Sequence, residues 1–111
     1  LNTIEKIKSI KGNVIFCGLG KSGHIANKIS ATMTSTGTPS IFLHASEANH
    51  GDLGIIRKDD LLFLISNSGE TNELKNIITY AKNNQVEVIS LTSNEKSFII
   101  YVYCFYLCTW I

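Results

Sequence analysis

Four short apolar segments alternate with helical patterns through residues 1–97, and this alternation constrains the fold more than any other feature of the sequence. The segments have strand length and are rich in β-branched and aromatic residues: 14–17, 40–43, 61–65 and 86–91. Strands that alternate with helices pair in parallel through right-handed crossovers. We therefore expect an α/β fold, a three-layer α/β/α sandwich built on a parallel sheet.

The helices between these strands are predicted from the spacing of apolar residues. Spacing of i, i+4, i+8 predicts a helix over about 22–35, and spacing of i, i+3, i+4, i+7 predicts a second helix that ends near Asn83. Ile4 and Ile7 indicate the end of a helix that enters the first strand. Parallel sheets bind ligands at the carboxyl ends of their strands, so the loops that follow the first three strands are the informative ones.

Composition excludes several classes of function. Ten basic and nine acidic residues are interspersed and give a net charge of +1, so we expect no nucleic-acid partner. The three cysteines form no C-x-x-C pair, which argues against a disulfide framework or a zinc site and favours the cytoplasm. We find no secretory signal at the start, and the last 14 residues are too short to span a bilayer, so we expect no membrane partner.

The loop GLGKSG, residues 18–23, follows the first strand and matches G-x-G-x-x-G. A dinucleotide site also needs an acid at the end of the second strand, where this chain has His44. A Walker A loop is excluded because Ile15 stands where its first glycine is required. A simple tight turn remains an alternative, but Lys21 at a helix N-terminus opposes the helix dipole and would be compensated by a bound anion.

The loop SNSGET, residues 66–71, follows the third strand and precedes a helix. Its hydroxyls, amide and glycine, together with the positive end of that helix, would cradle a phosphate. Helix capping is the alternative, although one Ser or Thr would suffice for it. Glu73, in the first turn of the same helix, is a candidate general base, and favourable interaction with the helix dipole alone would also explain it.

The segment HASEANHGDLG, residues 44–54, contains His44 and His50 between the two candidate anion loops. Their spacing fits neither H-x-x-x-H nor HExxH, so it gives no independent sign of a metal site. Loop histidines are commonly solvated, but the position of these two at strand ends favours a role in the site.

Taken in order, GLGKSGHIANKISAT, STGTPSIFLHASEANHGDLG and SNSGET resemble the sugar isomerase (SIS) domain, and within it the arabinose-5-phosphate isomerase branch. The resemblance covers about residues 14–92. It implies reversible conversion of D-ribulose 5-phosphate to D-arabinose 5-phosphate through an enediol, without a cofactor, in a cytoplasmic homo-oligomer. In Gram-negative bacteria this reaction feeds lipopolysaccharide biosynthesis.

The resemblance also implies roles for individual residues. The catalytic lysine falls on Lys21 and one catalytic glutamate on Glu73. His44 matches a position that can take a divalent metal, which the reaction does not require. The positions that match substrate contacts, the last three of them in the phosphate loop, are Gly37, Thr38, His44, His50, Ser66, Ser68 and Thr71.

The composition changes sharply after Ser97. Residues 98–111 contain no Asp, Glu, Lys or Arg and hold six of the ten aromatic residues. We therefore divide the chain into a partial SIS domain, residues 1–97, and an unmatched tail, residues 98–111, which we expect to derive from a frameshift in a decaying gene.

A second catalytic glutamate and a catalytic histidine of the family have no counterpart in the chain, so we expect weak activity or none from these 111 residues alone. Two alternatives stay open. One is a regulatory SIS module that binds a sugar phosphate without catalysis, and the other is a different SIS phosphosugar isomerase.

Overall fold

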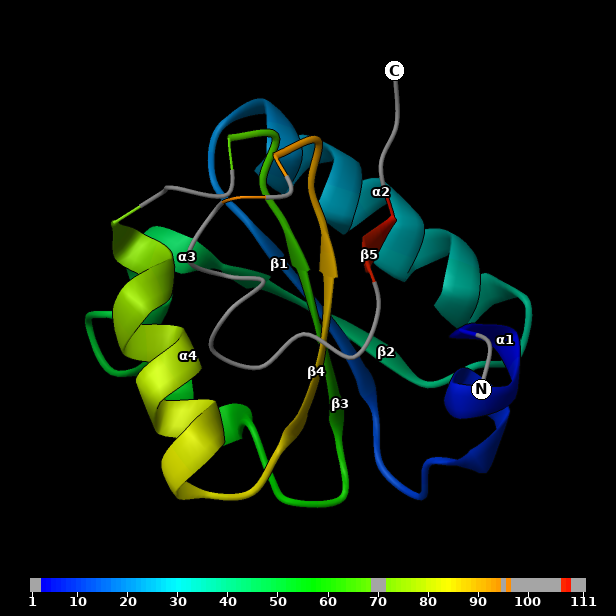
Figure 1. Cartoon of the computed structure of the whole chain (residues 1–111). Helices are drawn as coiled ribbons and strands as arrows, with labels where there is room; N and C mark the ends of the chain where they lie inside the picture. The colour runs from blue at the N-terminus through cyan, green and yellow to red at the C-terminus, as the bar shows by residue number, and fades with distance from the viewer. Residues whose placement is uncertain (1–2, 69–71, 95, 97–106, 109–111) are drawn as a thin grey trace.

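The computed structural model describes residues 3–68, 72–94, 96 and 107–108. These residues form a five-stranded sheet in the order β2-β1-β3-β4-β5, in which every neighbouring pair is parallel, with helices on both faces (Figure 1). In chain order the elements are α1 (Thr3–Ser9), β1 (Val14–Gly18), α2 (Lys21–Ser35), β2 (Ser40–His44), α3 (Ala45–Ala48), η1 (Asp52–Ile55), β3 (Leu61–Ile65), α4 (Glu73–Asn83), β4 (Glu87–Leu91) and β5 (Leu107–Cys108).

The predicted three-layer sandwich with a parallel sheet is confirmed. All four expected strands and all three expected helices form, with the strand ends shifted by at most one residue. Alternate residues of each strand face opposite layers, because the side-chain period of a strand is two. One apolar cluster lies between the sheet and α3 and α4, and it includes Ile15, Leu62, Leu64 and Ile77. The other lies between the sheet and α1 and α2, and it includes Val14, Phe16, Ala26 and Ile65.

Two segments differ from the expectation. The segment 44–54, expected as a loop, contains α3 and the 3-10 helix η1. Each has only four residues, which is too short for a 3.6-residue apolar period to be visible in the sequence. In the tail, for which the sequence analysis assigned no strand, Leu107 and Cys108 pair in parallel with Ser90 and Leu91 of β4. The division of the chain at residue 98 stays a prediction.

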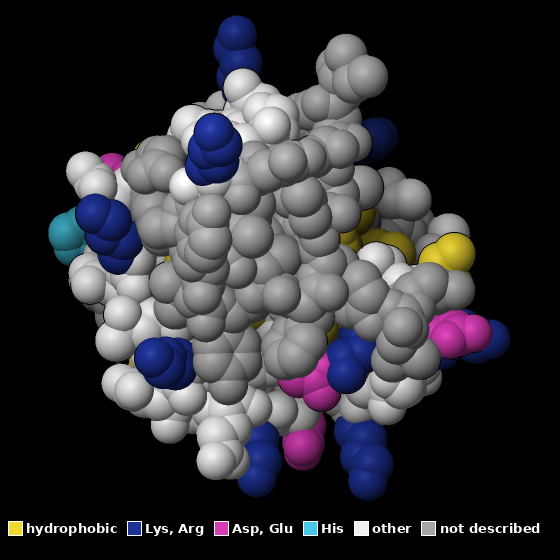
Figure 2. Space-filling view, in the orientation of Figure 1, with side chains coloured by type: hydrophobic (Ala, Val, Ile, Leu, Met, Phe, Trp, Pro, Cys, Tyr) yellow, Lys and Arg dark blue, Asp and Glu magenta, His cyan; other side chains and the backbone are white. Residues whose placement is uncertain are grey.

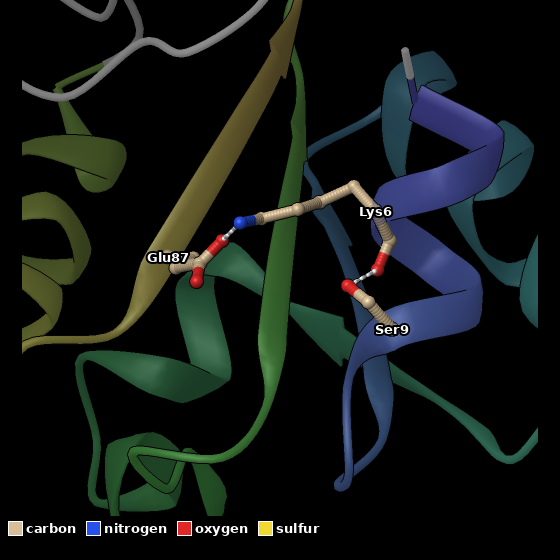
Figure 3. Close-up of polar contacts among 3 residues, drawn as sticks. All are labelled: Lys6, Ser9 and Glu87. Atoms are coloured by element: carbon tan, nitrogen blue, oxygen red, sulfur yellow. Dashed lines mark hydrogen bonds and ion pairs between the residues drawn. The ribbon is translucent and has the colours of Figure 1, made fainter. Parts of the chain in front are cut away.

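The amino ends of the strands are held by polar contacts away from the candidate loops. The Lys6 ammonium of α1 forms an ion pair with Glu87 at the start of β4 (Figure 3). Buried Asp60 accepts hydrogen bonds from the backbone N–H groups of Asn13 and Arg57, at 2.7 and 2.8 Å. These contacts therefore lie at the opposite end of the strands from the candidate loops.

Charged side chains are dispersed over the face that Figure 2 shows. Lys and Arg side chains lie around its rim, with Asp and Glu side chains between some of them, and the coloured basic side chains in this view do not gather into one patch.

Candidate functional site

The carboxyl ends of β1, β3 and β4 lie together at the top of Figure 1, and the loops that leave them form the candidate site. At this edge Gly18 of β1 is paired with His44 of β2. On the other side of β1, the backbone N–H of Ser66 donates to the carbonyl of Leu91 at 3.1 Å, which joins the ends of β3 and β4. The parallel sheet therefore brings together the ends of four strands, at residues 18, 44, 66 and 91, which lie more than 20 residues apart in sequence.

The glycine loop, residues 18–23, is shaped by close backbone contact. A Cβ added at Gly18 would lie 2.8 Å from the carbonyl of Ser22, and one at Gly23 would lie 3.1 Å from the carbonyl oxygen of Gly18. Gly20 has φ +61° and ψ −129°, a conformation that side chains disfavour. Gly18 and Gly23 are therefore required by the close approach of the strand end to the first turn of α2, and Gly20 is required by its backbone conformation.

Lys21 is the first residue of α2 and its side chain is exposed. The N-cap residue Gly20 offers no side chain to the helix N–H groups, and the first turn contains no acid. The positive end of this helix and the Lys21 ammonium therefore act in the same direction, and both favour an anion in front of the loop. His44, at the end of β2, confirms that the acid required for a dinucleotide ribose is absent from that position.

His44 is held in place by the short helix that follows it. Its Nδ1 accepts a hydrogen bond from the backbone N–H of Ser46 at 3.2 Å, and its ring meets Phe42 edge to face at 6.1 Å. An accepting Nδ1 leaves the proton of the neutral ring on Nε2. The ring Cδ2 lies 3.8 Å from the Cβ position of Gly23, so His44 borders the glycine loop.

Asn49 connects the histidine segment to the first turn of α4. Its amide nitrogen donates to the carbonyl of Glu73 at 3.3 Å and to that of Ala45 at 3.2 Å, while Asn76 donates to its Oδ1 at 3.2 Å. Glu73 is the first residue of α4, and His50, next to Asn49, is exposed. The Asn49 amide therefore joins the segment that precedes His50 to the backbone of Glu73.

The polar loop, residues 66–68, follows β3, with Ser66 buried and Ser68 exposed. Thr71, predicted to contact phosphate, lies outside the described residues. Asn72 is the N-cap of α4 and makes no side-chain capping hydrogen bond. The first turn of α4, like that of α2, therefore opens toward this edge without a cap from its own N-cap side chain.

A segment that the sequence analysis did not select supports the polar loop. Thr92, Ser93 and Asn94 follow β4, and all three donate hydrogen bonds to the backbone or side chain of Asn67 and Ser68. The signal that would have identified them is their polar character directly after a strand that adjoins β3. Asn49 had no comparable signal, because its partners come from a different helix.

Cys17 precedes Gly18 and faces the core. Burial raises the pKa of its thiol from 9.0 to about 12. A thiol with this pKa stays protonated at neutral pH and does not serve as a nucleophile.

Gly37 and Thr38 do not lie with the other predicted residues in the chain. They precede β2, where the backbone N–H of Thr38 donates to Met33 and that of Val14 donates to Pro39, so they lie at the amino ends of β1 and β2. Because all strands are parallel, this is the edge opposite the two anion loops.

Two further properties follow from the described part of the chain. It contains no group of three or more His, Cys, Asp or Glu side chains arranged to hold a metal ion, so the role of His44 toward a metal stays a prediction. Among the same residues there is no helix whose length and apolar character would allow it to cross a membrane.

Comparison with known proteins identifies relatives of the whole site region. The chain is 54% identical over 94 residues to the arabinose 5-phosphate isomerase KpsF of Escherichia coli O6:H1, and 52% identical over 94 residues to the uncharacterized protein RP505 of Rickettsia prowazekii. Each match covers 85% of this chain, and the chain spans only 29% and 30% of the length of these two relatives.

The solved structure of E. coli CFT073 c3406, a complex with a sugar phosphate, superposes on this chain with a TM-score of 0.90 at 45% identity, covering 96% of this chain and 56% of that one. The family model described as the SIS domain matches residues 6–101. The carboxyl-edge site described above therefore lies within the matched region, and the chain belongs to the SIS domain family.

Proposed function

We propose that this chain is the phosphosugar-binding part of an aldose–ketose isomerase that interconverts D-ribulose 5-phosphate and D-arabinose 5-phosphate. The observation that carries the proposal is the 54% identity to KpsF across the region that holds both anion loops. The sugar-phosphate complex of a homologue with a TM-score of 0.90 supports a ligand of the same class.

The proposed chemistry assigns a different role to each loop. The polar loop and the first turn of α4 hold the phosphate, because hydroxyl and helix N–H groups donate hydrogen bonds to an anion. The Lys21 ammonium stabilises the charge of the enediolate, and the Glu73 carboxylate moves the proton between C1 and C2. His44 and His50 contact the sugar between these groups. No cofactor is required for this proton transfer.

Gly37 and Thr38 lie at the opposite edge of the sheet, so their proposed contact with substrate requires a second copy of the chain. This is consistent with the homo-oligomer that we expect. The chain by itself is proposed to turn over weakly or not at all, since the second glutamate and the histidine of the expected catalytic set have no counterpart in its 111 residues.

The experiment that tests the proposal is a chimera in which residues 6–94 of this chain replace the matching segment of E. coli KpsF. We expect the chimera to interconvert the two pentose phosphates. Lys21→Ala should lower kcat about 10³-fold, because the charge that stabilises the enediolate is lost. Turnover is measured in both directions by following the ketose.

The matched control is Lys28→Ala, which removes another exposed lysine of α2 and should leave kcat unchanged. Undiminished turnover in Lys21→Ala would remove Lys21 from the mechanism. A chimera that binds D-arabinose 5-phosphate without turning it over would instead support a non-catalytic binding module.

A further inference from the structure

Every residue of the segment 92–94 donates a side-chain hydrogen bond to the polar loop. The carbonyl oxygen of Asn67 accepts from the Ser93 hydroxyl at 2.7 Å, from the Ser93 backbone N–H at 3.2 Å and from the Thr92 hydroxyl at 3.2 Å. The Asn94 amide donates to the carbonyl oxygen of Ser68 at 3.0 Å. Two consecutive carbonyl groups of the loop are therefore turned toward the end of β4.

This arrangement determines which way the loop presents its donors. A trans peptide unit directs its C=O and N–H in opposite directions. Since the Asn67 carbonyl points toward Thr92 and Ser93, the N–H of Ser68 in the same peptide unit points away from them. Backbone N–H groups that converge on one side of a loop form an anion-binding concavity.

The donor segment is itself held rigidly. Thr92 is fully buried, and its hydroxyl accepts from the backbone N–H of Asn94 at 3.2 Å. The Oδ1 of Asn94 accepts from the backbone N–H of Lys96 at 3.0 Å, which fixes the side chain so that its amide nitrogen faces Ser68. The Ser93 hydroxyl also lies 2.8 Å from Oδ1 of Asn67, and since it has one hydrogen to donate, this oxygen and the Asn67 carbonyl are alternative acceptors for it.

We propose that Thr92, Ser93 and Asn94 are positioning residues that set the polar loop in its phosphate-binding shape without contacting the phosphate themselves. This inference rests on the proposed function, because it concerns the same phosphate. It assigns the specificity of the loop for a phosphoryl group partly to residues 26 positions further along the chain, which the loop sequence by itself does not reveal.

The test compares Asn94→Ala with Asn84→Ala. Both changes remove an amide that donates to a backbone carbonyl, and Asn94→Ala also removes the acceptor of the Lys96 N–H, but Asn84 donates to Tyr80 at the end of α4, on the amino edge of the sheet. In the chimera described above, we expect Asn94→Ala to raise KM for D-arabinose 5-phosphate about fivefold to tenfold with kcat nearly unchanged, because the loop loses one of the hydrogen bonds that hold its phosphate donors in place. Asn84→Ala should change neither constant.

A role in stability alone would lower the active fraction, and with it kcat, without raising KM. Ser93→Ala should also raise KM, and Ser93→Thr, which keeps the hydroxyl, should restore it. An unchanged KM in both Asn94→Ala and Ser93→Ala would overturn the inference while leaving the proposed function intact. A chimera that neither binds nor converts the substrate would overturn the proposed function.

A second test of this positioning role needs no ligand. Amide hydrogen exchange is measured on the 111-residue chain at two backbone N–H groups. The exchange rate of the Ser93 N–H, which donates to Asn67, is compared with that of the His24 N–H, which donates to Gly20 in the other loop. Asn94→Ala should accelerate exchange at Ser93 about fivefold and leave His24 unchanged. Equal rates at Ser93 in the variant and the parent would contradict a positioning role even if the chimera is inactive.

Discussion

The two candidate anion loops of this chain leave adjacent parallel strands and precede the two longest helices of its described part, yet they are built in opposite ways. The glycine loop, 18–23, is determined by the absence of side chains, because backbone atoms of β1 and α2 approach within the space a Cβ would take. The polar loop, 66–68, is determined by the presence of side chains, since the segment after β4 holds its carbonyl groups.

This difference explains why the shape of the glycine loop follows from its own residues, whereas the residues that support the polar loop cannot be identified from the loop sequence. Steric exclusion is local, so three glycines and a lysine within six residues specify the glycine loop. A hydrogen bond joins residues of any separation, and the polar loop depends on donors brought beside it by strand pairing. The two loops should therefore respond differently to substitution, and three substitutions test this by the stability that each one removes.

The largest effect is expected at Gly18. Gly18→Ala places a Cβ 2.8 Å from backbone atoms of Ser22. These atoms belong to the first turn of α2, so they cannot move away without disturbing the helix. We expect the free energy of unfolding of the chain to fall by about 3 kcal/mol. Urea denaturation of the 111-residue chain measures it. Gly54→Ala is the control, because a Cβ there meets nothing within 4 Å, and equal stability of the two variants would contradict steric control of the glycine loop.

A smaller effect is expected at Gly20, where a Cβ meets no atom within 4 Å but φ is +61°. Gly20→Ala should therefore cost only backbone strain, about 1.5 kcal/mol, again measured by urea denaturation. A loss as large as that of Gly18→Ala would show that space, and not dihedral preference, limits this position. A loss within error of Gly54→Ala would show that the turn relaxes freely.

The smallest effect is expected in the segment that supports the polar loop. Thr92→Val keeps the shape of a buried side chain but removes the hydroxyl that links Asn67 and Asn94. Since the Asn67 carbonyl keeps its other donors from Ser93, the expected loss is about 1 kcal/mol by thermal denaturation.

Thr79→Val serves as the control for this change, because the Thr79 hydroxyl donates to Lys75 on the exposed side of α4, where water replaces it. A loss at Thr92 no greater than at Thr79 would mean that the polar loop holds its shape without this link.

The sequence predicted the fold and part of the candidate site for a common physical reason. Strand runs, helix spacing and loop glycines are local signals, and they placed β1 to β4, α2 and α4 within a residue or two and Lys21 at the start of α2. The short helix α3 and the 3-10 helix η1 gave no periodic signal, so the capping of α3 by His44 was not predicted.

The sequence determined the parallel α/β sandwich and the position of both candidate anion loops, and its family resemblance led to the proposal that Lys21 and Glu73 carry an isomerase reaction. It could not determine which distant side chains and carbonyl groups hydrogen-bond to one another around these loops. Only the tertiary structure separated Gly37 and Thr38 from the carboxyl edge and brought Asn49 to Glu73 and Asn94 to Ser68. The reason is physical: composition and periodicity act between near neighbours in sequence, whereas strand pairing decides which distant backbone groups lie within hydrogen-bond reach.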